Sequence, residues 1–219
     1  MLRVEGLSVS IKGFPILRGV TLEIPARGLI GLVGRNGAGK TSTMKGILGL
    51  VPVIGGRIAL DGADLVKVPA HKRARLGIGY MPEDRRLIGS LTVEDNILMP
   101  AWATGRRDDR QRLQYIYDIM PDVPPLAKRR ASTLSGGQQK MAALARAVMT
   151  GTKLLLLDEP FEGLSPATGE KFAGAIQALQ RVGLAILIAE SDNKRLEFVD
   201  SLFTIERGEI VESTGAVPT

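Results

Sequence analysis

LIGLVGRNGAGKTSTMKGILGL, residues 29–50, is the stretch that decides the fold. Its opening run, 29–33, is apolar and predicts a buried strand, and the residues after Lys40 predict a helix. Between them, GRNGAGKT matches the pattern G-x-x-x-x-G-K-[ST]. Glycines let the backbone wrap a triphosphate with its N–H groups, and the helix N-terminus favours the same negative charge. The stretch therefore predicts a phosphate loop in an α/β fold.

Particular residues of this loop have expected roles. Lys40 is expected to reach the β- and γ-phosphates of a nucleotide, and the Thr41 hydroxyl is expected to ligate Mg²⁺. The predicted nucleotide contacts are Gly34, Arg35, Asn36, Gly37, Ala38, Gly39, Lys40, Thr41 and Ser42.

Two further segments, 153–160 (KLLLLDEP) and 184–190 (LAILIAE), are apolar runs that end in polar residues. Such runs are typical of central parallel strands covered by helices on both faces, with functional groups at the carboxyl ends. Asp158 is expected to hold Mg²⁺ through water, and Glu159 to act as general base on the attacking water. A strand-end cap is the alternative for an isolated DEP, but the phosphate loop favours the nucleotide interpretation.

The rest of the chain predicts two additions to this core. Alternating apolar residues at Val4, Leu7 and Val9, and again within 20–24 and 58–60, predict antiparallel strands. Residues 88–130 carry helical patterns interrupted by PDVPP at 121–125. We expect one domain, 1–219, with 1–82 and 134–219 as the core with its antiparallel strands and 83–133 as a helical insertion.

Composition limits the other function classes. The chain of 219 residues has no cysteine, which rules out disulfides and thiolate metal sites. Its net charge of +6 comes from basic residues dispersed among acids with few aromatics, so nucleic acid is not an expected partner. No run approaches the roughly 18 apolar residues of a membrane span, and the N-terminus lacks a signal-peptide pattern. Any membrane association is expected to be peripheral.

A third motif, LSGGQQ at 134–139, narrows the choice among nucleotide-binding proteins. Its glycines, a serine hydroxyl and the start of a helix predict a second anion site at Ser135, Gly136, Gly137 and Gln138. One chain cannot easily bring both anion sites to one γ-phosphate, whereas two copies arranged head to tail can.

With these motifs the sequence resembles the nucleotide-binding subunits of ABC transporters over essentially its whole length. Residues 34–41 match the Walker A motif, 134–138 the signature, and 154–159 Walker B with the catalytic glutamate. The resemblance implies a P-loop NTPase (RecA-like) core with an N-terminal antiparallel β-subdomain and an inserted α-helical subdomain. Residues 80–98 and 154–166 look like the ATPases of branched-chain amino acid importers and of related importers of urea or other amides.

The resemblance also implies cofactors, partners and a location. These are ATP and Mg²⁺, a second ATPase subunit of the same or a homologous chain, transmembrane permease subunits and, indirectly, an extracytoplasmic substrate-binding protein. The protein would lie on the cytoplasmic side of the inner membrane. Glu83 takes the Q-loop position, with a catalytic and metal-binding role, and 163–166 forms the D-loop.

Two positions depart from the family pattern. Ile11 occupies the place of the aromatic residue that stacks on adenine, with Phe14 nearby. Ser191 occupies the place of the histidine that contacts the γ-phosphate. Serine can donate one hydrogen bond but carries no charge. Ser191 therefore either contacts the γ-phosphate in a competent ATPase or marks a degraded switch, in a subunit that regulates or completes a partner ATPase. A soluble ABC-type ATPase outside transport is a further alternative.

Overall fold

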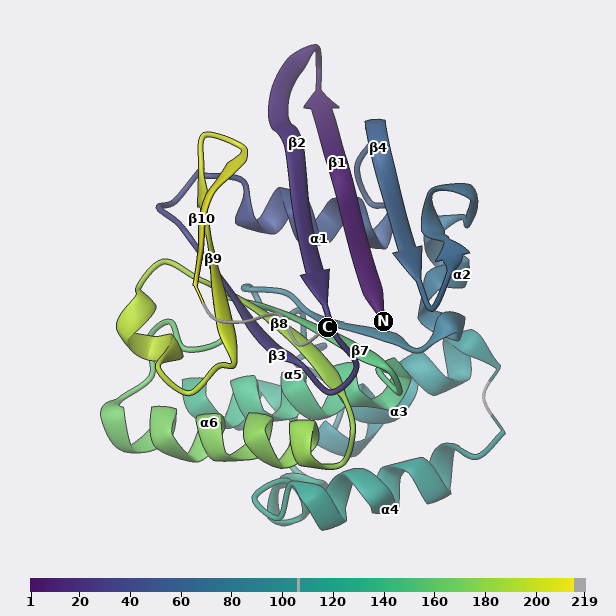
Figure 1. Cartoon of the computed structure of the whole chain (residues 1–219). Helices are drawn as coiled ribbons and strands as arrows, with labels where there is room; N and C mark the ends of the chain where they lie inside the picture. Colours follow the sequence, from purple (N-terminus) through teal and green to yellow (C-terminus); the bar gives the residue numbers. More distant parts are fainter. Residues whose placement is uncertain (106, 215–219) are drawn as a thin grey trace.

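The computed structural model describes residues 1–105 and 107–214, which form two β-sheets with helices between and below them (Figure 1). The larger sheet has six strands in the order β10-β9-β3-β8-β7-β6. Its parallel centre consists of β3 (Leu29–Val33), β8 (Ala185–Glu190), β7 (Leu154–Asp158) and β6 (Ile78–Met81), and β9 (Ser201–Glu206) runs parallel to β3. The three apolar runs of the sequence are therefore adjacent strands, as predicted.

The smaller sheet has the order β2-β1-β4-β5 and is antiparallel throughout. Its strands are β1 (Leu2–Ile11), β2 (Phe14–Ile24), β4 (Val53–Leu60) and β5 (Ala63–Asp64). The antiparallel sheet predicted from the alternating residues is confirmed.

Alternate residues of the central strands enter different cores. In β7, Leu154 and Leu156 pack with β1, β2 and the long helix α1 (Lys40–Leu48) between the two sheets. Leu155 and Leu157 pack on the other face, against the helices at the bottom of Figure 1. A strand with both faces covered needs a continuous apolar sequence, because successive side chains point to opposite faces.

The helical region lies between β6 and α5 (Gly136–Thr150), the helix that begins in the LSGGQQ motif. It contains α3 (Val93–Thr104) and α4 (Asp109–Ile119), followed by the 3₁₀ turns η3 (Pro124–Leu126) and η4 (Ala131–Thr133). Thr92 caps α3 by accepting a hydrogen bond from the N–H of Asp95, and α4 ends just before PDVPP, as the prolines predict.

The remaining elements are listed here with their bounds: α5 (Gly136–Thr150), α6 (Pro166–Arg181), α2 (Ala70–Arg73), η1 (Leu65–Lys67), η2 (Ala74–Leu76), η5 (Asn193–Leu196) and β10 (Glu209–Thr214). The short strand β6 and the pair β9 and β10 were absent from the sequence prediction. Among the described residues no helix is both long and apolar enough to cross a membrane.

Candidate active site

The phosphate loop follows β3 and leads directly into α1, with glycines where only glycine fits. Gly39 precedes α1 with φ 119°, and Gly37 has φ 81°. A Cβ at Gly34 would lie 2.3 Å from the carbonyl oxygen of Ile205, and one at Gly39 would lie 2.7 Å from Leu17 Cδ2. The loop therefore requires its glycines for backbone conformation and for packing.

Lys40, the first residue of α1, lies across the mouth of this loop. Its side chain is only 5% exposed, and Nζ donates to the carbonyl oxygens of Gly34 at 2.6 Å and Arg35 at 3.3 Å. The same Nζ lies 3.0 Å from Glu159 Oε1. The cation is thus held at the centre of the site, among groups that a phosphate oxygen can replace.

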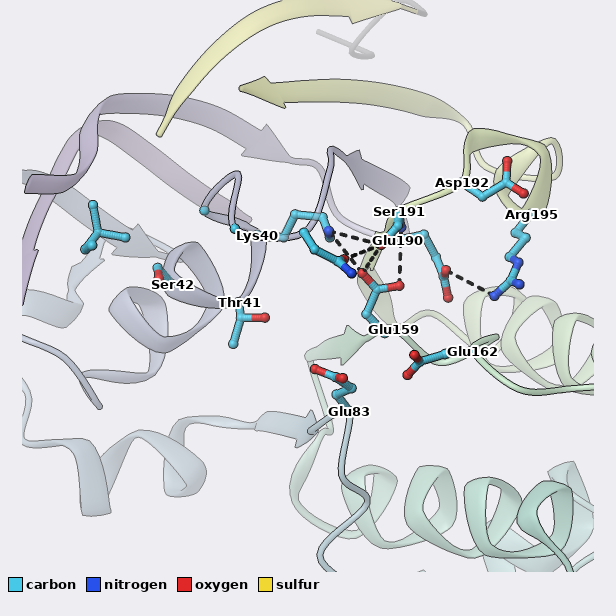
Figure 2. Close-up of a pocket in the computed structure, with 14 residues that line it drawn as sticks. Lys40, Thr41, Ser42, Glu83, Glu159, Glu162, Glu190, Ser191, Asp192 and Arg195 are labelled. Atoms are coloured by element: carbon cyan, nitrogen blue, oxygen red, sulfur yellow. Dashed lines mark hydrogen bonds and ion pairs between the residues drawn. The ribbon is translucent and has the colours of Figure 1, made fainter. Parts of the chain in front are cut away.

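A cavity of about 570 Å³ opens in front of Lys40 (Figure 2). It brings together residues from the phosphate loop, the end of β7, the end of β8 and the segment after β6. The sequence-predicted residues that line it are Asn36, Gly37, Gly39, Lys40, Thr41, Ser42, Glu83, Glu159 and Ser191. Ile16, Glu162, Glu190, Asp192 and Arg195 also line it and were not predicted as site residues.

Thr41 and Asp158 form the predicted metal-binding edge. The Thr41 hydroxyl donates to Asp158 Oδ1 at 3.0 Å, and the Tyr80 hydroxyl donates to Oδ2 at 3.1 Å. Burial raises the pKa of Asp158, although these two hydrogen bonds oppose the effect. Hydroxyl and carboxylate oxygens suit Mg²⁺, which binds few protein ligands and completes its shell with water and phosphate oxygens. Among the described residues there is no cluster of three or more His, Cys, Asp or Glu that could hold a metal ion.

Glu159 has an unusual backbone and a well-fixed carboxylate. Its φ is 46°, a left-handed conformation that costs a non-glycine residue about 1–3 kcal/mol. The carboxylate accepts from the Ser191 hydroxyl at 2.6 Å and from the Ser191 N–H at 3.2 Å. Burial raises the pKa of Glu159, but hydrogen bonds from Ser191 and Lys40 outweigh it and leave the pKa below its ordinary value. Glu159 is therefore kept ionised, as a general base must be.

Ser191 is part of the same polar network (Figure 2). Its Oγ lies 3.0 Å from Asn36 Oδ1 and accepts from Lys40 Nζ at 3.3 Å. A hydroxyl has one hydrogen, and the short contact to Glu159 is the one that uses it. The strand end thus joins the phosphate loop to the candidate base.

Glu83 follows β6 and faces the cavity from the opposite side (Figure 2). Partial burial raises its pKa, and the charges of Glu162 and Asp158 act in the same direction. Carboxylates at 83, 159 and 162 thus all line the cavity, a further reason for it to attract a cation.

The two residues expected near adenine lie outside this cavity. Ile11 is 38% exposed and Phe14 is 72% exposed, and neither lines the cavity. The structure instead places Ile16 of β2 there. No local sequence signal distinguishes Ile16, because its position depends on how β2 packs against Gly208 in the turn between β9 and β10.

The signature residues lie at the start of α5 and do not line the cavity. Ser135 caps the helix by accepting from the N–H of Gln138 at 3.3 Å, and Gln138 Oε1 accepts from the Ser135 N–H at 3.1 Å. A Cβ at Gly137 would lie 2.6 Å from Thr168 Cγ2. Within one chain, therefore, Ser135, Gly136, Gly137 and Gln138 form a helix N-terminus apart from the phosphate loop.

Comparison with known proteins agrees with this geometry. The ABC transporter family profile matches residues 17–162. A probable branched-chain amino acid transport ATP-binding protein, LivF of Archaeoglobus fulgidus, is 34% identical over 96% of this chain and 90% of its own length. The high-affinity branched-chain amino acid transport ATP-binding protein BraG of Pseudomonas aeruginosa is 34% identical over 99% of this chain and 94% of its own.

Other relatives carry different cargo names. The lipopolysaccharide export system ATP-binding protein LptB of Escherichia coli K12 is 30% identical over 96% of this chain and 88% of its own.

Among solved structures, the dimeric ATP-binding cassette MJ0796 in a post-hydrolysis state with ADP and Pi superposes with a TM-score of 0.87 over 100% of both chains. The sequence identity is 22%, so the likeness is one of fold.

The matched profile covers the phosphate loop, the signature and Asp158 with Glu159, and the full-length relatives are ATP-binding subunits of transporters. The chain therefore belongs to the ABC transporter family, as an ATP-binding subunit with the fold and enzyme class of an ABC ATPase.

Proposed function

We propose that this subunit drives an importer of branched-chain or other amino acids. The support is the 34% identity to LivF and BraG over nearly the whole of all three chains. LptB, at 30% identity, makes lipopolysaccharide export the competing cargo class. Cargo is chosen by other subunits, so the test must include them.

The contact that carries the proposed chemistry is the one between Lys40 and Glu159. In the proposed reaction Lys40 leaves the Glu159 carboxylate for the β- and γ-phosphate oxygens, and the freed carboxylate accepts a proton from the attacking water. The loop N–H groups of 34–39 and the start of α1 stabilise the phosphate charge. Ser42 and Ile16 contact the nucleotide along the cavity wall.

Thr41 and Asp158 would hold Mg²⁺, with Glu83 on the opposite wall as a further oxygen ligand, direct or through water. When bound, Mg²⁺ supplies positive charge that neutralises the phosphate oxygens during transfer. Tyr80 keeps the Asp158 carboxylate oriented through its hydrogen bond.

For Ser191 we favour an active role over a degraded switch. Its hydroxyl contacts Glu159, Asn36 and Lys40, and these contacts support a role for it beside the γ-phosphate. It can orient the base and donate to a phosphate oxygen, although without the charge of an imidazolium. The alternative, a switch completed by a homologous partner ATPase, makes turnover depend on that partner.

The proposed assembly is a head-to-tail pair in which Ser135, Gly136, Gly137 and Gln138 of one subunit close the nucleotide of the other. The separation of these residues from their own cavity, and the fold likeness to a dimeric cassette, support this arrangement. Permease subunits would contact the segment 83–133, which we propose as the Q-loop and helical subdomain. A substrate-binding protein would act through them, at the cytoplasmic face of the inner membrane and without nucleic acid.

The test is coexpression of the subunit with its neighbouring permease genes and reconstitution in vesicles with the binding protein. We expect ATP-dependent uptake of leucine, isoleucine or valine, and loss of uptake with Lys40→Ala. If the reconstituted complex hydrolyses ATP but takes up no amino acid from a panel, and lipopolysaccharide stimulates its ATPase rate, an export function would replace the proposed import function. Turnover only with a second, different ATPase chain would favour the degraded-switch alternative.

A further inference from the structure

The turn that carries Glu159 is held from two sides by buried ionisable side chains from different elements. The turn spans 159–162 and is closed by the N–H of Glu162 donating to the Glu159 carbonyl at 3.3 Å. Its first residue has the left-handed φ of 46°. A strained turn persists only where its surroundings fix it, so the groups that fix it also place the Glu159 carboxylate.

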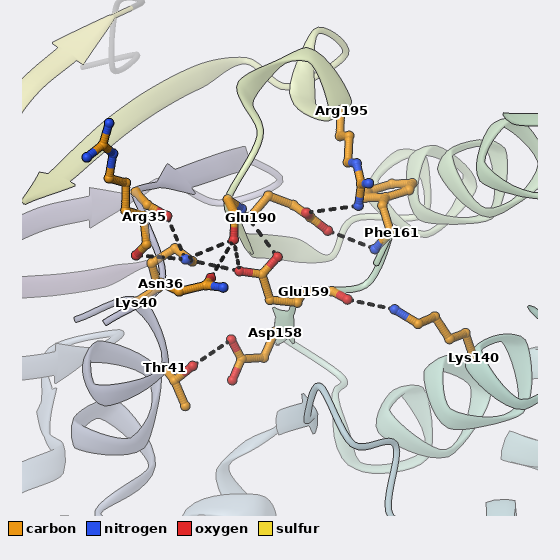
Figure 3. A network of polar contacts seen from close by, with 12 residues as sticks. Arg35, Asn36, Lys40, Thr41, Lys140, Asp158, Glu159, Phe161, Glu190 and Arg195 are labelled. Carbon is orange, nitrogen blue, oxygen red and sulfur yellow. Dashed lines mark hydrogen bonds and ion pairs between the residues drawn. The ribbon is translucent and has the colours of Figure 1, made fainter. Parts of the chain in front are cut away.

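Lys140 holds the turn from the signature helix. Its Nζ donates to the Glu159 carbonyl at 2.7 Å, and the residue is only 3% exposed (Figure 3). Burial lowers its pKa to about 8; the carboxylates of Glu190, Glu162 and Glu159 oppose this shift, and the charge of Arg85 reinforces it. A buried ammonium aimed at a main-chain carbonyl is costly, so packing alone does not account for this cation.

Glu190 holds the turn from β8. Its Oε1 accepts from the N–H of Phe161 at 2.7 Å, while Oε2 has no hydrogen-bond partner and lies 3.7 Å from the Arg195 guanidinium. The residue is completely buried. Burial raises its pKa to about 8; the Phe161 N–H and Arg195 oppose the shift, and the charge of Glu159 adds to it.

The two contacts flank Pro160, the residue that follows the base in the chain. Lys140 fixes the carbonyl of Glu159, and Glu190 fixes the N–H of Phe161, so the peptides on either side of Pro160 are both restrained. Lys140 also lies five residues after Ser135, the N-cap of α5, and Glu190 directly precedes Ser191. The turn is thus linked to the signature helix and to the strand that ends at the γ-phosphate position.

From this geometry we propose that Lys140 and Glu190 are positioning residues for ATP hydrolysis, which fix the turn 159–162 and thereby the Glu159 carboxylate against Lys40 and Ser191. The proposal rests on the role of Glu159 as the base. Neither residue touches the substrate in this mechanism. Their loss misplaces a catalytic group, for which a shift of about 1 Å can cost on the order of 100-fold in rate.

The experiment measures kcat and KM for ATP, equilibrium ATP binding and thermal unfolding in the full-length protein. Lys140→Met removes the donor but fills the same buried space, and thermal unfolding reports how much stability is lost when the Glu159 carbonyl loses its hydrogen bond. We expect kcat to fall at least 10-fold while KM and ATP affinity stay within about threefold. Lys171→Met, on the exposed face of α6, is the matched control and should behave as wild type.

Glu190→Met and Glu190→Gln separate geometry from charge. Glutamine keeps the carbonyl acceptor for the Phe161 N–H, so kcat should stay within about threefold of wild type, whereas methionine lacks the acceptor and should fall at least 10-fold. A folded Lys140→Met or Glu190→Met protein that hydrolyses ATP at the wild-type rate overturns the proposal. So does a rise in KM with unchanged kcat.

Glu159→Gln, measured in parallel, distinguishes this failure from failure of the proposed chemistry. If Glu159→Gln turns over normally, Glu159 is not the base and the premise is wrong. If Glu159→Gln is inactive and Lys140→Met is unimpaired, the base stands and the positioning roles are wrong.

Discussion

Lys40 Nζ lies 3.0 Å from Glu159 Oε1, with both side chains almost completely buried. The cation that should bind phosphate and the carboxylate that should activate water therefore neutralise each other before a nucleotide arrives. Nucleotide binding must break this ion pair, and its cost is part of the apparent affinity for ATP.

Glu159→Gln should consequently separate binding from turnover. We expect phosphate release to fall about 100-fold or more, since general-base catalysis supplies roughly 10²–10⁴. ATP should bind as tightly as in wild type or more tightly, because Lys40 no longer has an anionic competitor. Phosphate-release assays and equilibrium binding check both; Lys40→Ala, which should lose ATP binding, is the control. Weaker ATP binding by Glu159→Gln would contradict this view of the ion pair.

Removing the Ser191 hydroxyl should change the pH dependence of turnover. Ser191 and Lys40 hold the pKa of Glu159 below its ordinary value against the effect of burial. In Ser191→Ala the pKa should rise, and because the base must be ionised, the acidic limb of the kcat profile should move to higher pH. Ser213→Ala on β10 is the control. An unchanged acidic limb in Ser191→Ala would show that the hydroxyl does not act on the base.

The affinity for the purine base of the nucleotide should depend on Ile16 and not on Ile11. Ile16 lines the cavity, so Ile16→Ala should weaken ATP binding by about 1 kcal/mol, or roughly fivefold, while Ile11→Ala changes it less than about twofold. An apolar contact without a stacking ring discriminates poorly between adenine and guanine. The affinity for GTP should therefore lie within about 10-fold of the affinity for ATP. Competition binding measures both, and a large preference for ATP would count against a purely apolar base site.

The pH dependence of the free energy of unfolding should reflect the protonation of Glu190. Its folded-state pKa of about 8 lies above the ordinary value, so the protonated form is favoured by the fold. Its contribution to stability is complete at acidic pH and is lost as pH rises towards and through 8, by at most about 1.4 kcal/mol per pH unit. Urea unfolding between pH 5.5 and 8 should show a flatter dependence for Glu190→Gln than for wild type. Glu212→Gln, at an exposed site, should leave the slope as it is.

Packing between β6 and α5 should fail when Gly79 gains a side chain. A Cβ there would lie 2.1 Å from the Ala147 carbonyl oxygen, so Gly79→Ala should destabilise the fold by about 3 kcal/mol. Gly174 in α6 has no atom within 4 Å of such a Cβ, and Gly174→Ala should instead stabilise by about 0.5–1 kcal/mol. Urea unfolding of both variants gives the comparison. Equal effects of the two would contradict the packing argument.

The parts of the site that the sequence predicted are those whose chemistry lies in consecutive residues. Asp158 and Glu159 lie at the end of an apolar strand, and Lys40 and Thr41 begin the helix that follows another such strand through the glycine-rich loop. The parallel order of β3, β8 and β7 then brings Ser191 to the same edge. The strands β9 and β10 were not predicted, although the sequence carries a signal for them: apolar and polar residues alternate in 201–214 around an Arg-Gly turn.

The residues that the sequence did not predict acquire their roles from packing between distant elements. Tyr80 meets Asp158 because β6 lies beside β7, and Lys140 meets Glu159 because α5 crosses the end of the same strand. Glu190 looked like an ordinary polar strand end. Its burial depends on the turn 159–162, which folds over it, and no local sequence pattern encodes that contact.

Ile16 belongs to the antiparallel sheet, whereas Lys40, Asp158, Glu159 and Ser191 all follow from the parallel one. If Ile16 contacts the nucleotide as we propose, the preference for its purine base and the hydrolysis of its phosphate are set from different sheets. Leu17, the neighbour of Ile16, packs against Gly39 of the phosphate loop, so a change of the β2 strand that alters nucleotide preference must also keep this contact.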